Sequence, residues 1–99
     1  MMAEVSHENL TEFLPTGNFY QVTLRATPSA GGNSDEYIDT ELSEVTSVVG
    51  YRVDSDVQVA MNFKKNAKGT GLAEGSSLGY LGFESGSTDP FEVTVTGRP

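Results

Sequence analysis

The sequence predicts an all-β fold: a small β-sandwich or barrel of five to six antiparallel strands, preceded by an N-terminal arm. Three observations predict it. Apolar residues alternate with polar ones in several short stretches, which is the pattern of half-buried strands. Glycine-rich turns separate these stretches, and helix signals are almost absent from the 99 residues. Short strands in this arrangement pack as two sheets or close into a barrel.

The size and composition fit one small folded domain. A hydrophobic fraction of 36% together with 11 glycines is ordinary for a globular chain of 99 residues. We divide the chain into an arm at residues 1–18 and a β-sandwich domain at residues 19–99. The chain contains no cysteine, which excludes disulfides and thiolate metal sites.

The arm is a polar leader with a small apolar group. Residues 6–9 are expected to cap a short helical turn that carries Leu10, Phe13 and Leu14. A helix of at most two turns is marginal on its own in water. The three apolar side chains therefore need a surface, which is either the core of the domain or a neighbouring subunit.

The domain is expected to open with a strand at residues 19–27 and a loop at 28–35, where small and turn-forming residues dominate. A short edge strand at 37–38 and one helical turn capped by Asp39 or Thr40 come next. One face of the first strand carries Tyr20, Val22, Leu24 and Ala26.

A β-hairpin is the clearest local prediction. Its strands are residues 45–53 and 57–63, which both alternate with period two and are joined by the polar residues 54–56. Gly50 weakens the first strand and is expected to mark a bulge. One face of the first strand carries Val45, Ser47, Val49, Tyr51 and Val53, and the inner face of the second carries Val57, Val59, Met61 and Phe63.

Two more strands are predicted in the last third of the chain. Residues 64–76 are a long loop whose three glycines give it mobility or unusual backbone angles. Residues 77–84 form a strand interrupted by two glycines, and residues 85–90 turn the chain. The last strand is at residues 91–96, and its inward side chains are Phe91, Val93 and Val95.

Catalytic signals are weak, and the chain is not expected to be an enzyme. Ser77 is the centre of a G-x-S-x-G pattern, but that motif needs a strand–turn–helix context with a histidine further along the chain. The only histidine, His7, lies in the leader, so a histidine base or a metal cluster has nothing to build on. We therefore assign no catalytic, cofactor-binding or metal-ligating residue and expect no cofactor.

Loop carboxylates and glycines leave two weaker alternatives. Asp54 with Asp56, or Asp39 with Glu41, could hold calcium together with backbone carbonyls. The twelve-residue calcium loop is missing, however, and solvated carboxylates are the commoner case. Residues 69–75 resemble a phosphate-binding loop only loosely, because the GKS/T ending is missing.

The charge argues against two classes of partner. A net charge of −8 disfavours general binding to nucleic acid and docking on anionic membranes. No stretch is apolar for long enough to span a membrane. Carboxylates gather between residues 35 and 56, whereas three lysines lie between residues 64 and 68. The lysines are either a solubilising loop tip or an electrostatic contact with an acidic subunit surface. The candidate partner-binding residues are therefore Leu10, Phe13, Leu14, Lys64, Lys65 and Lys68.

Three stretches give the chain a resemblance to small structural proteins of tailed bacteriophages, the decoration or cement proteins of the capsid. Residues 17–24 form a strand after a polar leader. Residues 37–49 form an acidic turn that runs into a valine-rich strand, and residues 91–98 form a last strand closed by Gly-Arg. Together these stretches cover under half of the chain, and phage neck and tail proteins share similar patterns.

The resemblance implies a virion structural protein that binds and stabilises the capsid surface, made in the host cytoplasm. Its partner would be the major capsid protein or another virion protein, and it would assemble as a homotrimer. Residues 1–18 would form an arm that reaches over neighbouring subunits. The alternative is a neck, tail or adhesion module that binds a carbohydrate or another surface ligand. The lack of tryptophan counts against that alternative, because carbohydrate sites usually expose aromatic side chains.

Overall fold

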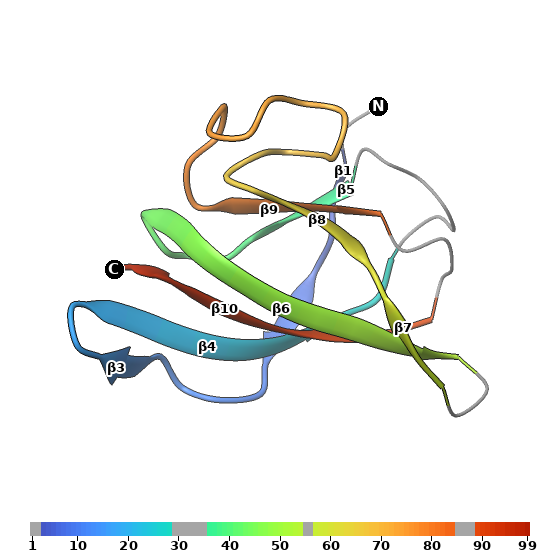
Figure 1. The fold of residues 1–99 in the computed structure, drawn as a ribbon, viewed down its shortest axis with the longest axis horizontal. Helices are drawn as coiled ribbons and strands as arrows, with labels where there is room; N and C mark the ends of the chain where they lie inside the picture. The colour runs from blue at the N-terminus through green and yellow to red at the C-terminus, as the bar shows by residue number, and fades with distance from the viewer. Residues whose placement is uncertain (1–2, 29–35, 55–56, 85–88) are drawn as a thin grey trace.

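The computed structural model describes residues 3–28, 36–54, 57–84 and 89–99, and it confirms the all-β prediction: these residues form ten strands and no helix. The strands are β1 (Ala3–Glu4), β2 (His7–Asn9), β3 (Leu14–Thr16), β4 (Phe19–Ala26), β5 (Glu36–Asp39), β6 (Glu44–Asp54), β7 (Val57–Ala60), β8 (Asn62–Lys65), β9 (Tyr80–Glu84) and β10 (Phe91–Arg98). They form two layers, with β4, β10 and β6 running side by side in the larger one (Figure 1).

The two layers are a four-stranded sheet, in the order β1-β5-β9-β8, and a six-stranded sheet, in the order β2-β4-β10-β6-β7 with β3 also on β4. All pairs are antiparallel except the two-residue pair of β1 with β5. The six strands predicted from the sequence correspond to β4, β5, β6, the run of β7 and β8, β9 and β10. The short strand predicted at residues 37–38 lies inside the four-stranded sheet, between β1 and β9.

The predicted helical turn in the leader is wrong. Strands β2 and β3 pair with β4 instead, because a strand edge offers backbone partners that an isolated short helix lacks. Between β1 and β2 the chain passes from one sheet to the other, and Val5 at this crossing is 5% exposed and belongs to the core. The leader thus lies against the domain in this structure.

The strand predicted at residues 57–63 divides into two. Its first part, β7, pairs with β6 in the six-stranded sheet, so the predicted hairpin is confirmed there. At Met61 the chain leaves that sheet, and β8 then pairs with β9 in the other sheet. Met61 and Phe63 pack against the core, as predicted, whereas the side chains of Val57 and Val59 lie outside the described part of the structure.

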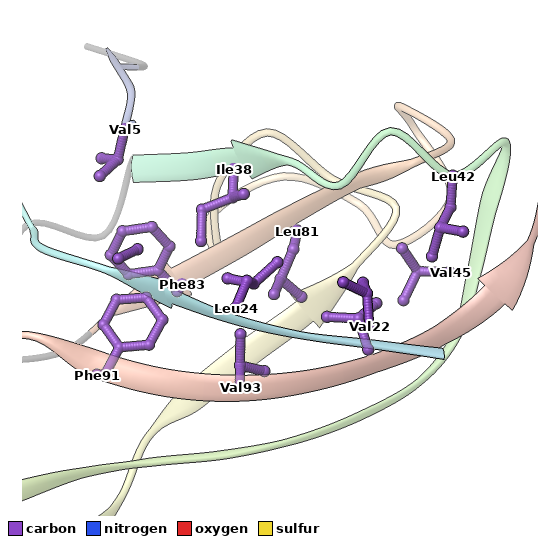
Figure 2. Close-up of a cluster of buried hydrophobic side chains, with 12 residues drawn as sticks. Val5, Val22, Leu24, Ile38, Leu42, Val45, Leu81, Phe83, Phe91 and Val93 are labelled. Carbon is purple, nitrogen blue, oxygen red and sulfur yellow. The ribbon is translucent and has the colours of Figure 1, made fainter. Parts of the chain in front are cut away.

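The core lies between the two sheets, and its buried side chains come mainly from β4, β5, β6, β9 and β10 (Figure 2). Phe83 of β9 and Phe91 of β10 come from opposite sheets, and their ring centroids are 4.8 Å apart. Burial alternates along β4 and β10, which is the pattern that the sequence predicted for both strands. The buried side chains of the cluster are Val5, Val22, Leu24, Ala26, Ile38, Leu42, Val45, Leu81, Phe83, Phe91, Val93 and Val95.

A β-bulge in β6 overturns the predicted face of that strand. Thr96 of β10 pairs with Ser47 and Gly97 pairs with Val45, so Thr46 is the extra residue. One extra residue moves every later side chain to the opposite face. Val45 and Val48 therefore face the core, whereas Val49 is 70% exposed.

The predicted bulge at Gly50 is wrong, and a different glycine permits the real one. A Cβ atom at Gly97 would collide with the carbonyl oxygen of Glu44, so only glycine lets the two strands approach this closely. Gly50 instead lies under the ring of Phe63, which a Cβ atom there would approach to 2.9 Å.

The predicted helical turn between β5 and β6 is also wrong, although its capping residues are used. The carboxylate of Asp39 accepts a hydrogen bond from the Glu41 amide at 3.0 Å, and the Thr40 hydroxyl accepts one from the Leu42 amide at 3.3 Å. Glu41 has a φ of 67°, so the chain turns in a left-handed conformation and cannot continue as a helix. The predicted connections lie partly outside the described residues, at 29–35, 55–56 and 85–88.

Candidate functional site: a docking surface

The outer faces of the two sheets differ, because the chain covers one of them itself. The loop of residues 66–79 lies over the four-stranded sheet, where Ala67 is fully buried. The loop backbone at Gly69 is so close to the sheet that a Cβ atom on Gly82 would lie 2.7 Å from it. This close approach requires glycine at residue 82.

Two of the three lysines of the predicted partner-binding cluster, Lys64 and Lys68, lie at this covered face. Lys64 donates a hydrogen bond to the Thr70 carbonyl at 3.1 Å. Lys68 lies over the rings of Tyr37 and Tyr80, with its Nζ 5.6 Å and 4.7 Å from their centroids. Such cation–π contacts, like the hydrogen bond of Lys64, attach the loop to the sheet beneath it.

Lys65 and Asn66 attach the same loop at its other side. Lys65 forms an ion pair with Glu74 at 3.6 Å. The Asn66 side chain accepts hydrogen bonds from the amides of Val45 and Gly79 and donates one to the Val45 carbonyl, at 2.8, 3.1 and 2.8 Å. A loop held by so many bonds is a structural cover, which leaves the outer face of the six-stranded sheet as the candidate site.

Three strands form the middle of that outer face: β4, β10 and β6. Their outward residues lie in rows, with Thr94 opposite both Thr23 and Val49, and Thr96 opposite both Gln21 and Ser47. The hydroxyl oxygens of Thr23 and Thr94 are hydrogen-bonded at 3.0 Å. We name these two rows the uncharged face: Gln21, Thr23, Ser47, Val49, Thr94 and Thr96.

The uncharged face is unusual for a chain with a net charge of −8. Its six side chains carry hydroxyl, amide or methyl groups only. Val49 stands exposed near its middle, and at 70% it has the largest exposed fraction among the large hydrophobic side chains that the structure describes. The arrangement offers an apolar contact surrounded by weakly polar groups and has no general base, nucleophile or cluster of charges.

Ion pairs and a shallow hollow lie beyond the two ends of the uncharged face. At one end Arg25 pairs with Glu92 at 3.3 Å, and at the other Arg98 pairs with Glu44 at 3.3 Å. All four side chains are substantially exposed, so these pairs mark a polar rim and contribute little to stability. A hollow of about 450 Å³ adjoins the first pair and is lined by Arg25, Tyr51, Asp89, Pro90, Phe91 and Glu92.

The structure separates the three apolar residues predicted to bind a partner. Phe13 packs against the core and lines a second hollow of about 210 Å³ with Tyr20 and Leu42. Leu14 is 50% exposed and pairs with Gln21, so it adjoins the uncharged face. Leu10 is 40% exposed, and its amide donates to the Thr23 carbonyl at 2.7 Å.

The residues considered for chemistry lie apart. His7 is in β2 on the six-stranded sheet, whereas Ser77 is in the covering loop, where its amide donates to the Asn66 carbonyl at 2.8 Å. The chain enters strand β9 after the Ser77 motif, as predicted, and a nucleophile elbow would enter a helix there. Within the described ranges, no three His, Cys, Asp or Glu residues lie close enough to share a metal ion.

Of the carboxylates considered for calcium, Asp39 accepts a hydrogen bond from the Glu41 amide. Asp56 lies outside the described residues. In the part of the chain that the structure describes, no helix is long and apolar enough to cross a membrane.

Sequence reasoning missed the uncharged face because it placed Val49 and Tyr51 with Val45. The missing signal was Gly97, whose pairing with Val45 permits the bulge that turns Val49 outward. Comparison with protein-family models, with curated proteins and with solved structures found no match to this chain.

Proposed function

We propose that this chain is a non-catalytic structural protein that docks on another protein through the uncharged face. Within that class we propose a virion component that decorates and stabilises a capsid, as the resemblance in residues 17–24, 37–49 and 91–98 suggests. The partner is then the major capsid protein or another virion protein.

The single observation that carries the proposal is the uncharged sheet face, which the described residues leave uncovered and which has Val49 at its middle. The centres of protein–protein interfaces are depleted in charged residues, and their rims are polar. The uncharged face with ion pairs at both ends has this arrangement. The other sheet is already covered by its own loop, so it offers no equivalent surface.

The size of the face suits a repeated weak contact. With strands about 4.8 Å apart and residues about 3.3 Å apart, the two rows on the three central strands present roughly 200 Å². A stable pairwise interface usually buries about 800 Å² on each partner. A component that covers a lattice gains avidity from many copies, so each contact can be modest.

Cosedimentation with virus particles purified without this protein tests the proposal. Wild-type protein is expected to bind to saturation, and Val49→Lys to bind at least tenfold more weakly because a charge is buried in the contact. Leu78→Lys is the matched control: Leu78 is 57% exposed in the covering loop, and the charge change is the same. Equal binding of the two variants, or no binding of the wild type at saturating concentration, would refute the proposal.

One observation favours the alternative of a carbohydrate-binding module. The hollow at the end of the uncharged face places Tyr51 beside Arg25 and Glu92, and an aromatic ring next to charged hydrogen-bonding groups suits a sugar. Selective hits on a glycan array that Tyr51→Ala abolishes, with Val49→Lys unaffected, would favour this alternative over docking on protein.

A further inference from the structure

Strand β7 differs from the other strands at the ends of the two sheets. Edge strands avoid unwanted pairing in several ways: some are very short, some carry charged side chains, especially lysine, and some contain proline. Strands β1, β2 and β3 have two or three residues, and β8 carries two lysines. Strand β7, with the sequence VQVA, has four residues and none of these devices.

We infer that β7 is an interaction edge, which pairs antiparallel with β7 of a second copy of this chain about a two-fold axis. In the described part of the structure β7 pairs with β6 on one side only, and it ends the six-stranded sheet (Figure 1). An exposed strand edge offers a row of backbone donors and acceptors to an added strand.

The register with β6 fixes which backbone groups are free to pair. Only two residues separate Asp54 from Val57, so these paired residues exchange backbone hydrogen bonds as the last pair of a hairpin. Hydrogen-bonded and non-hydrogen-bonded residue pairs alternate along an antiparallel pair of strands, so the backbone N–H and C=O groups of Val59 also point towards β6. Gln58 and Ala60 therefore turn their N–H and C=O groups away from the sheet.

Only one two-fold register uses all of these groups. With Val59 beside the axis, Gln58 of each copy lies opposite Ala60 of the other, and four backbone hydrogen bonds form. A two-fold pair is closed, so it ends as a dimer and does not grow into a fibre.

The charge of the chain does not oppose this pairing. In the antiparallel register the two copies of Asp54, each opposite Val57 on β6, are roughly 20 Å apart, because three strand spacings of about 4.8 Å separate the two β6 strands and about four residues of 3.3 Å offset them. That distance exceeds the Debye length of about 8 Å at physiological salt, so their repulsion is screened.

The pairing also extends the uncharged face. A two-fold axis perpendicular to the sheet keeps both outer faces on the same side, so the two uncharged faces become parts of one surface. The joined surface presents roughly 400 Å², twice the area of one uncharged face and about half the area that one partner buries in an ordinary interface. The inference does not depend on the docking function, and it predicts a two-fold pair where the resemblance implies a trimer.

Sedimentation equilibrium of the isolated protein, over a concentration series into the millimolar range, tests the inference. The wild type is expected to show a monomer–dimer equilibrium. Gln58→Pro removes the outward N–H and leaves the bonds to β6 in place, so its dissociation constant is expected to rise at least tenfold. Gln58→Lys, which keeps the backbone N–H but adds like charges near the axis, is expected to weaken the dimer similarly.

Ser76→Lys, in the exposed covering loop, is the control for added charge and is expected to dimerise as the wild type does. Urea unfolding of each variant shows that it is folded. Hydrogen exchange gives a second readout, in which the amides of Gln58 and Ala60 become protected as concentration rises. A monomer at every concentration, a trimer, or a dimer that is insensitive to both Gln58 variants would overturn the inference. If the protein stays monomeric at every concentration but still binds the particles, the edge pairing is refuted and the proposed docking function is not.

Discussion

Asn66 shows how one residue can hold two parts of this fold together. Its side chain bonds both backbone groups of Val45 and the amide of Gly79, while its own carbonyl accepts from the amides of Gly75 and Ser77. It has a φ of 59°, a left-handed conformation that asparagine adopts more readily than most residues. The sequence suggested only a loop tip between lysines, because hydrogen bonds to residues this distant leave no local pattern.

We expect Asn66→Ala to lower the free energy of unfolding by about 3 kcal/mol or more. The change removes three hydrogen bonds from a buried site and places alanine in a left-handed conformation. Asn66→Gly loses the same bonds without that backbone cost, so it should be destabilised less. Urea denaturation measures both, and a midpoint for Asn66→Ala equal to that of the wild type would contradict this role.

The strands show what period-two patterning can and cannot predict. The buried residues of β4 and β10 follow their apolar alternation, so both strands and their core-facing sides could be predicted. In β6, both Val45 and Val49 are apolar, and the pattern alone cannot show that an extra residue lies between them. The uncharged face therefore required the structure, although each of the strands that form it was predicted.

The leader strands give a test of whether residues 1–18 belong to the domain. Val5 is 5% exposed at the crossing between the sheets, and its amide donates to the Tyr37 carbonyl at 2.8 Å. We expect Val5→Ala to destabilise the protein by about 1–2 kcal/mol, since buried methyl groups are lost. Leu10→Ala, at a residue 40% exposed, should stay within about 0.5 kcal/mol of the wild type. Equal stability of both variants in thermal or urea unfolding would indicate a leader that does not pack on the domain.

For the whole molecule, the distribution of charge decides how salt should affect docking. The net charge is −8, yet the proposed contact is uncharged, and the lysines of residues 64–68 are engaged with their own chain. Docking through the uncharged face should therefore not weaken when salt is raised tenfold. Docking through the lysine cluster would weaken by roughly tenfold or more, because salt screens exposed charges. Particle binding measured at low and high salt distinguishes the two surfaces.

The fold class, most of the strands and the core could be predicted from the sequence, because the local alternation of apolar and polar residues determines them. The covering loop, the sheet change at Met61 and the bare outer face result from contacts between distant segments. Ala67 and Gly82 illustrate this, since neither residue type indicates that a loop will lie on the sheet there. The candidate site is defined by what the loop leaves uncovered, and local patterns do not report that.

Hydroxyl-radical footprinting of the particle-bound protein tests docking through the uncharged face, because it reports which side chains become covered. Val49 and Leu14 are 70% and 50% exposed in the free chain, and Leu78, at 57%, is exposed in the covering loop. We expect binding to suppress oxidation of Val49 and Leu14 and to leave Leu78 unchanged. Protection of Leu78 with continued oxidation of Val49 would place the contact on the opposite sheet and would contradict docking through the uncharged face.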